Sequence, residues 1–423
     1  MPTSVADTPP HAHGLRHLPR NVWVVTLTSF LTDVSSEMAF NLIPLFLASV
    51  LGVKTNVIGL IEGIAETTAS LLKVFSGWFS DRLGRRKWLT VAGYSLSTVA
   101  KPFLYFATSW WSVLAVRFAD RVGKGIRTAP RDALVASSVE ERNRGIAFGV
   151  HRAGDTAGAA LGLVIALLVV LATQSGQVTL ARETFQAVVL LSIIPAALAV
   201  VVLAVGARDV VVRDARTARP RLSLAGFDRR FRLFLLAVVI FTLGNSADAF
   251  LILRANALGV SVAGVLAILV AFNVVYAAVS GPAGALSDRV GRRRLIVGGW
   301  VAYALIYLGF AAASEVWHVA ALYALYGLYY GLTEGTAKAL VADLVSAPQR
   351  GTAYGVYNMA VGVMALPASV IAGVLWQGVG GWEGLGPGAP FLFGAVVALA
   401  AVAILMRALR RPKPGARESG DAR

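Results

Sequence analysis

The sequence contains no cysteine and has little charge for its length. None of its 423 residues is cysteine, which excludes disulfides, thiol catalysis and cysteine-ligated metal sites. Charged residues make up 15% of the chain, against about 25% in soluble domains. Because a surface that faces water needs more charge than this, the composition argues against a soluble protein.

Motifs for nucleotide binding and catalysis are also missing. The G-x-x-x-x-G-K-[ST] loop that cradles phosphates is absent, and the segment 123–125 has the wrong spacing and flanks for one. The sequence shows no Ser-His-Asp arrangement and no metal-ligand cluster. We therefore expect neither an ATP-driven pump nor an enzyme, and we expect no cofactor and no metal.

Acidic residues are fewer than basic residues. The chain has 23 Asp and Glu against 39 Lys and Arg, for a net charge of +16. In a soluble protein this excess would suggest nucleic acid as a partner. Here the basic residues fall mostly in short connections between apolar runs, and no basic patch is interleaved with aromatics. The positive-inside rule of membrane proteins explains the pattern better.

Apolar residues dominate what is present. They make up 57% of the chain, and the mean hydropathy is +0.68. Runs near the spanning length of about 20 residues recur, and they are continuous rather than alternating, which favours helices over a β-barrel. We predict an all-α polytopic membrane protein with the following spans: 22–50, 57–80, 88–107, 111–136, 145–172, 185–206, 232–257, 260–286, 295–313, 316–345, 352–376 and 390–409.

An even number of spans places both termini on one side of the membrane. Arginine-rich connections follow the second, sixth and eighth spans, and such loops stay cytoplasmic. We therefore expect a multi-pass protein of the cell membrane whose two ends are cytoplasmic. The expected segments are a tail at 1–21, a six-helix bundle at 22–206, a cytoplasmic central loop at 207–231, a second bundle at 232–409 and a tail at 410–423.

One motif occurs twice, about half the chain apart. Residues 77–87 read GWFSDRLGRRK, and residues 284–294 read GALSDRVGRRR. Other short segments match as well: ALVA occurs at 133–136 and again at 339–342. A repeat at half-length predicts two structurally similar halves. Positive-inside topology alone accounts for the arginines of the motif, but not for an aspartate and two glycines at fixed spacing.

The pattern G-x-x-x-D-R-x-G-R-R, between spans two and three and again between spans eight and nine, resembles the signature loop of the major facilitator superfamily. The resemblance covers nearly the whole chain. It implies two pseudo-symmetric six-helix bundles, a secondary transporter that works by alternating access, and a loop that latches the halves in the outward-open state. The residues that it assigns to a cytoplasmic gate are Gly77, Asp81, Arg82, Gly84, Arg85, Arg86, Asp132, Gly284, Asp288, Arg289, Gly291, Arg292 and Arg293.

Two further segments resemble motifs of proton-driven drug antiporters, with departures. The R-x-x-Q-G pattern of that branch appears at 121–125 with lysine in place of glutamine. The G-P-x-x-G-G pattern appears at 158–163 without its proline and its last glycine. Both departures weaken an assignment to that branch. Gly154, Gly158 and Gly162 still form a face of small residues that predicts close helix packing.

Ionisable residues inside the spans are the candidates for chemistry, because each costs about 2.5–3.5 kcal/mol to insert. The span 111–136 carries a stripe of them at spacings of three or four. Candidates for proton coupling or the central cavity are Asp33, Glu37, Asp120, Arg121, His151, Asp155, Asp248 and Glu334. Candidates for substrate binding are Arg117, Lys124, Arg152, Arg254, Asn245, Tyr326, Tyr330 and Asn358.

Several of these residues have simpler interpretations. His151 and Asp155 lie one turn apart and can form a structural bond. Glu334 and Lys338 can neutralise each other. Glu62 and Glu66 share a face, where a role at the rim of the cavity is as plausible as a proton role. The first half carries most of the charge, so we expect coupling chemistry there.

The functional prediction is a proton-coupled secondary transporter of a small solute. Its partners would be the solute, protons and the lipid bilayer, with no nucleic acid, and we expect a monomer. Export of amphipathic compounds is slightly favoured by the motif resemblance. One alternative is a carrier of organic or phosphorylated anions that uses the cationic stripe. Another is a membrane sensor on the same scaffold.

Overall fold

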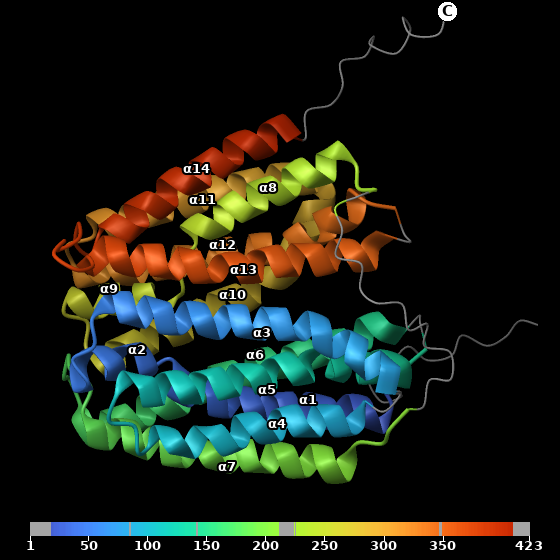
Figure 1. Cartoon of the computed structure of the whole chain (residues 1–423), viewed down its shortest axis with the longest axis horizontal. Coiled ribbons are helices and arrows are strands. Elements are labelled where there is room, and N and C mark those ends of the chain that lie inside the picture. Colours follow the sequence, from blue (N-terminus) through green and yellow to red (C-terminus); the bar gives the residue numbers. More distant parts are fainter. Residues whose placement is uncertain are drawn as a thin grey trace, which may run out of the picture.

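The computed structural model describes residues 18–83, 86–140, 143–210, 224, 226–346 and 349–408, and these are helical almost throughout. Figure 1 shows long, roughly parallel rods. The helices in chain order are α1 Arg20–Phe40, α2 Ile43–Leu45, α3 Thr55–Leu83, α4 Lys87–Ala100, α5 Trp110–Ser138, α6 Arg144–Gln174, α7 Arg182–Gly206, α8 Arg229–Gly244, α9 Ala249–Ala257, α10 Val262–Val290, α11 Arg292–Ala312, α12 Val316–Asp343, α13 Arg350–Gln377 and α14 Ala389–Ala408.

These helices form the twelve predicted rods, of which three are composite. The first joins α1, α2 and a π-helical turn at Phe46–Val50; the third joins α4 to a 3₁₀ turn at Lys101–Leu104; the seventh joins α8 to α9. Eight rods are long and apolar enough to cross a membrane by composition. The other four, built on α3, α4, α5 and α12, are short or carry charges in their interiors.

Breaks in the first and seventh rods are the main difference from the predicted continuous spans. In the first, α1 ends at Phe40, and α2 begins next to Pro44, whose missing N–H cannot continue the helical ladder. In the seventh, Asn245 leaves the helical conformation (φ −99°, ψ 84°), and α9 resumes at Ala249. Hydropathy averaged over a span does not detect such breaks, because the run from Arg229 to Ala257 stays apolar on average despite the polar residues at 245, 246 and 248.

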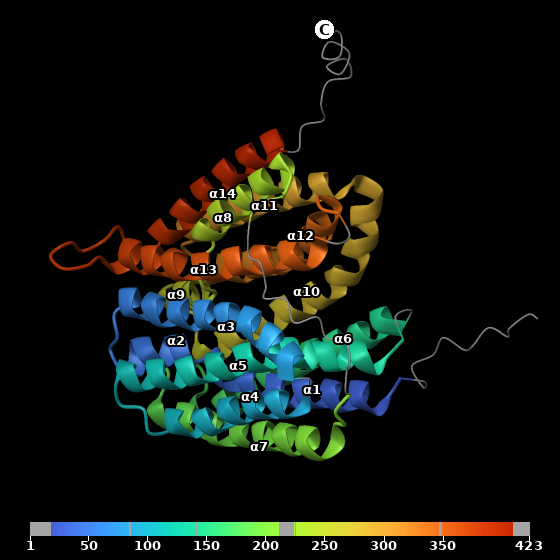
Figure 2. The same ribbon diagram turned by 45° about the vertical axis from the view of Figure 1, so that its right-hand side comes forward.

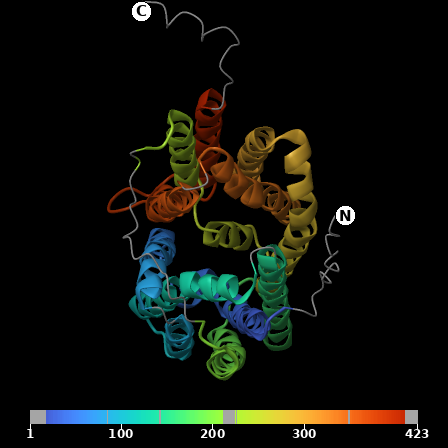
Figure 3. The same ribbon diagram turned by 90° about the vertical axis from the view of Figure 1, so that its right-hand side faces the viewer.

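The rods form two bundles, α1–α7 and α8–α14, which lie one above the other in Figures 1 and 2. Figure 3 shows the two groups end-on, with α9 between them. Within the first bundle, α6 packs on α1 through its small-residue face: a methyl group added at Gly158 would lie 2.4 Å from the carbonyl oxygen of Phe30, and one at Gly162 would lie 2.4 Å from that of Val34. The predicted close packing is confirmed.

The bundles are tied together at the end of the molecule opposite the repeated loops. The backbone N–H of Thr55 donates to Gln377 Oε1 (2.6 Å), and Asn56 Nδ2 donates to the carbonyl of Gly378 (2.9 Å). Between α10 and the loop after α6, the N–H of Val262 donates to the carbonyl of Gln177 (3.0 Å). The described ends of α1, α7, α8 and α14 that flank the tails and central loop all lie at the other end, with the repeated loops (Figure 1).

The cores of the two bundles differ in chemistry. The second bundle is filled by stacked aromatics, such as Phe241 on Trp300 (ring centres 4.4 Å apart) and Tyr303 on Tyr307 (4.0 Å). The first bundle instead buries ion pairs, the closest of which joins Arg117 to Glu62. Charge therefore concentrates on one side of the plane between the halves.

Candidate functional site

A cavity of about 360 Å³ lies between the two bundles. Its walls come from α1, α3 and α5 on one side and from α8, α9, α12 and α13 on the other. Both helix breaks border it: Asn41 and Pro44 line it from the first rod, and the segment 245–248 lines it from the seventh. Interrupted helices in corresponding positions of two repeats are typical of substrate sites in secondary transporters.

The cavity continues toward the repeated loops. A second cavity of about 300 Å³ shares Asp33, Glu37, Lys124 and Arg127 with the first. A third, of about 530 Å³, shares Arg152 and Tyr276 with the second and ends at residues beside the second repeated loop. The shared walls make one path from the centre of the molecule to that end.

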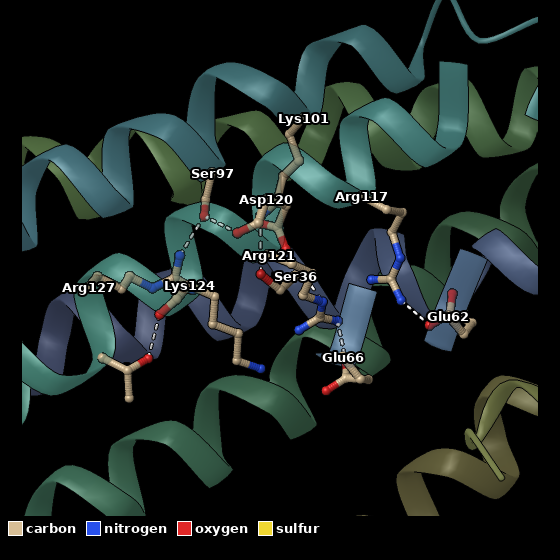
Figure 4. Close-up of polar contacts among 11 residues, drawn as sticks. Ser36, Glu62, Glu66, Ser97, Lys101, Arg117, Asp120, Arg121, Lys124 and Arg127 are labelled. Carbon is tan, nitrogen blue, oxygen red and sulfur yellow. Dashed lines mark hydrogen bonds and ion pairs between the residues drawn. The ribbon is translucent and has the colours of Figure 1, made fainter. Parts of the chain in front are cut away.

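The predicted stripe of charge on α5 lines the central cavity. Arg117 is 3% exposed and forms an ion pair with Glu62 of α3. One turn further, Arg121 Nη2 lies 3.2 Å from Glu66 Oε1 (Figure 4). Asp120, on the same helix, lies further off, with its Oδ2 4.0 Å from Arg121 Nε. Arg117 and Arg121 are therefore neutralised by two carboxylates on the facing helix.

The inner end of the stripe is anchored differently. Arg127 Nη1 donates to Ser97 Oγ (2.5 Å), and Ser97 Oγ donates to the carbonyl of Asp120 (3.1 Å), which ties α5 to α4. Lys124 lines both the first and the second cavity. Within the part of the chain that the structure describes, its ammonium group makes no hydrogen bond and no ion pair.

Lys101 is a site residue that the sequence reasoning missed. It is 1% exposed, and its Nζ donates to Ser35 Oγ (2.5 Å) and Ser36 Oγ (3.2 Å) on α1. Phe40 lies beside it, with its ring centre 5.3 Å from Lys101 Nζ and 4.9 Å from the guanidinium carbon of Arg117. The signal was available: a lysine inside an apolar span is costly enough to need a partner.

Carboxylates on α1 supply the opposite charge. Glu37 Oε2 accepts a hydrogen bond from Asn41 Nδ2 (2.7 Å), beside the break in the first rod. Asp33, one turn earlier, lines both cavities. Among the described residues it has no hydrogen-bond or ion-pair partner, so it is available to a ligand or a proton.

His151 belongs to a buried network on the path rather than to the central cavity. Its Nδ1 lies 3.5 Å from Asp155 Oδ2, and its Nε2 lies 3.0 Å from Ser29 Oγ. Ser29 also shares a hydrogen bond with Tyr94 and accepts one from Arg131 Nη1 (3.2 Å). The structural bond considered for His151 and Asp155 is therefore present.

The second bundle contributes fewer charges to the cavity. Asp248 lies at the break before α9, and its Oδ1 accepts a hydrogen bond from Tyr326 (3.1 Å). Asn245 and Tyr330 also line the central cavity. Arg254 lies elsewhere, and its guanidinium donates to the carbonyls of Phe310 (3.0 Å) and Ala313 (2.7 Å) at the end of α11.

Asn358, on α13, is half-buried and lines none of the three cavities. Tyr326 does not line the central cavity, but it donates a hydrogen bond to Asp248, which does.

One network joins the two bundles along the path. Arg152 of α6 donates to Tyr276 of α10 (2.5 Å) and lies 3.5 Å from Glu334 of α12. Tyr276 donates to Glu334 (2.6 Å), which also binds Lys338 (3.0 Å). The predicted pairing of Glu334 with Lys338 is present, and Arg152 extends it across the interface.

One arginine of each repeated loop contacts the ALVA segment of its own half, although Arg86 is the second arginine after the last glycine of its motif and Arg292 is the first after that of its own. Arg86 Nη1 donates to the carbonyl of Ala133 (3.0 Å), and Arg292 Nη1 donates to that of Ala339 (3.0 Å). At Gly291 φ is +93°, a left-handed conformation that suits glycine. Arg82 and Arg289 are exposed.

The remaining members of the predicted gate are described less fully. Gly77 faces Ala129 of α5, and Asp132 pairs with Arg131 (2.8 Å). Arg293 Nη2 donates to the carbonyl of Met406 on α14 (3.2 Å). Gly84 and Arg85 lie outside the described residues. Asp81, Gly284 and Asp288 belong to described helices, but their side-chain surroundings are not described.

Two helical bundles around a polar cavity in a membrane-spanning chain define the class of polytopic transporters. The family model of the Major Facilitator Superfamily matches residues 25–254 and 233–423. The chain therefore belongs to the major facilitator superfamily.

Relatives and solved structures agree with this membership. An uncharacterized MFS-type transporter of Methanocaldococcus jannaschii is 35% identical over 92% of this chain and 95% of its own length. An uncharacterized protein of Mycobacterium tuberculosis is 29% identical over 85% of this chain and 87% of its own. The crystal structure of the nucleoside transporter NupG superimposes with a TM-score of 0.76 at 12% identity, covering 92% of this chain and all (100%) of that one.

A structure of a POT family transporter gives a TM-score of 0.75 at 13% identity, covering 93% of this chain and 97% of that one. At these identities the two solved structures show the fold alone. The chain is thus an integral membrane protein with the transporter fold of its family.

Proposed function

We propose that this protein is a proton-coupled antiporter that exports small amphipathic solutes bearing a positive charge. The observation that carries the proposal is the charge balance of the central cavity. Six carboxylates and four cations line it. The carboxylates are Asp33, Glu37, Glu62, Glu66, Asp120 and Asp248; the cations are Arg117, Arg121, Lys124 and Arg127.

Pairing within the protein leaves a negative excess. Arg117 with Glu62 and Arg121 with Glu66 cancel each other, which leaves four carboxylates against two cations. Lys101, just behind the wall, offsets one more carboxylate without removing the excess. A cationic solute between Asp33 on one wall and Asp248 on the other would neutralise it. The ring of Tyr330, which also lines the cavity, offers a face to such a cation.

The same carboxylates explain coupling by exchange. An uncompensated charge inside a membrane protein is costly, so an open carboxylate favours either a proton or a cationic ligand. Because one carboxylate cannot hold both, binding of the solute releases a proton, and protonation releases the solute. Such competition produces antiport, in which proton entry drives the solute outward.

Orientation follows from the arginine-rich loops. We place the repeated loops, both termini and the central loop in the cytoplasm, in line with the positive-inside rule. The path that leads from the central cavity to these loops is then an inward-facing entry. In this state the outer ends of the bundles are tied through Thr55 and Gln377. Alternating access requires those ties to break while the loops close.

The anion-carrier alternative depends on Lys124, the cation of the stripe that has no partner in the described part of the chain. It predicts that Lys124→Gln abolishes transport of an anion. The antiport proposal predicts instead that Lys124→Gln retains exchange of a cation. The sensor alternative predicts no transport of either.

Proteoliposomes with an acidic interior test the proposal. Addition of a panel of amphipathic quaternary ammonium ions outside, whose fixed charge prevents them from crossing as neutral bases, should dissipate the gradient, read from a pH-sensitive dye, only in vesicles that contain the protein. Asp33→Asn and Asp248→Asn should each abolish the response. Glu183→Gln, which makes a similar change at an exposed position on α7 away from the cavity, should leave it intact. A response that survives both Asp variants would refute the proposal, as would a folded protein that responds to anions only.

A further inference from the structure

A groove on the outer surface of the second bundle is separate from the transport cavity. It lies between α11 and α12, which pack side by side, and has a volume of about 320 Å³. Its walls are almost wholly apolar, and their one charged residue is Arg294 at one end. Leu305, Leu325 and Leu328 on its walls are 63%, 49% and 39% exposed. These exposed side chains line none of the three cavities of the transport path, so on rods that cross the membrane they face the bilayer.

The length of the groove matches one leaflet. Arg294, Gly298, Ala302 and Leu305 follow one another along a single face of α11. The eleven residue-to-residue rises from Arg294 to Leu305 span about 16 Å of α-helix. Half of a hydrocarbon core of about 30 Å is about 15 Å. The groove therefore runs from the interface, where α11 begins, to about the middle of the membrane.

Glycine forms the floor of the groove. A methyl group added at Gly298 would meet no atom within 4 Å, so the space above this residue is open. The neighbouring Gly299, by contrast, packs against Thr333, where an added methyl would lie 2.1 Å from Cγ2. Gly299 therefore lets α12 pack closely against α11, and Gly298 leaves the groove open beside this contact.

Arg294 provides charge at the interfacial end. It is exposed, and within the described part of the chain its guanidinium has no hydrogen-bond or ion-pair partner. Its neighbours differ, because Arg292 binds Asp343 (2.5 Å) and Arg293 binds the carbonyl of Met406 (3.2 Å). The first turn of α11 also has no side-chain cap, so its backbone N–H groups add positive potential nearby.

We propose that the groove between α11 and α12 is a binding site for an anionic phospholipid. One acyl chain lies along Gly298 and Ala302, and the headgroup phosphate pairs with Arg294. The occupant is a lipid rather than a second protein chain, because the groove has the length of a single leaflet and a single cation at headgroup level. Its position beside the second repeated loop places the lipid next to the moving part of the transporter.

Native mass spectrometry of the delipidated protein tests the site. After titration with phosphatidylglycerol or phosphatidylcholine of matched chains, phosphatidylglycerol should bind about fivefold more tightly, as expected for one arginine at a membrane surface. Arg294→Gln should remove this preference. Gly298→Leu should fill the groove and lower binding of both lipids. Soluble glycerol phosphate, which has the charge without the chain, should not bind.

Matched variants keep the test decisive. Arg232→Gln removes an exposed arginine from α8 at the end of the molecule where Arg294 lies. Gly281→Leu introduces leucine at an open position on α10. Both variants should bind lipid as the unaltered protein does. Equal affinity for the two lipids would overturn the proposal. So would a preference that survives Arg294→Gln. If Gly298→Leu fails to fold, the comparison of Arg294→Gln with Arg232→Gln decides the question.

Discussion

Removal of Glu62 should destabilise the first bundle far more than removal of Glu66, although both carboxylates pair with an arginine of α5. The Arg117 and Glu62 side chains are 3% and 8% exposed. Loss of one partner from a buried ion pair costs about 3–5 kcal/mol, because the remaining charge is left uncompensated. Nothing nearby replaces Glu62: Arg117 Nε and Nη1 have no hydrogen-bond partner among the described residues.

The ring of Phe40, 4.9 Å from the guanidinium of Arg117, offsets only part of this loss. A cation–π contact contributes about 0.5–2 kcal/mol, which is less than the cost of the unpaired charge. We therefore expect Glu62→Gln to lower the free energy of unfolding by about 2–3 kcal/mol or more. Glu66 is 45% exposed, so Glu66→Gln should cost only about 0–1 kcal/mol.

Equilibrium unfolding in mixed detergent and SDS micelles, followed by tryptophan fluorescence, measures both variants. The double variant Glu62→Leu/Arg117→Met removes the pair together and should regain most of the stability lost in Glu62→Gln, since an apolar pair of similar volume is often as stable as a buried ion pair. Equal stabilities for Glu62→Gln and Glu66→Gln would refute the reasoning, as would a double variant less stable than Glu62→Gln.

Three further predictions concern topology and motion. Because the chain has no cysteine, a single cysteine at Ser175 should react with an impermeant maleimide in intact cells, whereas one at Arg230 should react only in inverted membrane vesicles; labelling of both from the same face would contradict the topology. Gly362→Val should clash with Ser70, because an added methyl group at residue 362 lies 2.0 Å from Ser70 Cβ. We expect slower transport and a smaller population of the state described here, in which the path opens toward the repeated loops. Double electron–electron resonance between spin labels on the two halves measures that population. Arg152→Gln should break the bridge to Glu334 and change the rate of exchange without abolishing cargo binding, which binding and flux assays can separate.

Much of the fold was predictable because it depends on local signals. Apolar runs and arginine-rich connections predicted the twelve rods, and the repeated loops predicted two similar halves. The breaks at Asn41 and at Asn245 were not predicted, because a few polar residues inside a long apolar run do not interrupt the hydropathy of the span. Spacing on one helix correctly placed Arg117, Arg121 and Lys124 on a single face toward the cavity.

The site was predictable only in part, because spacing along one helix says nothing about its neighbour. The stripe on α5 suggested a strongly cationic wall, whereas Glu62 and Glu66 of α3 neutralise two of its members. Arg254 looked like a cavity residue on grounds of composition, but it caps the end of α11.

The sequence by itself determined the family, the number of rods and the repeated loops, because hydropathy, charge and short motifs are properties of contiguous residues. Only the tertiary structure decided which charges pair, which remain open to the cavity and where a groove faces the lipid. These outcomes depend on which helices become neighbours and on how closely glycines let them approach. Lys101 shows this most directly: its ammonium group acquires a role only because α4 packs against the serines of α1.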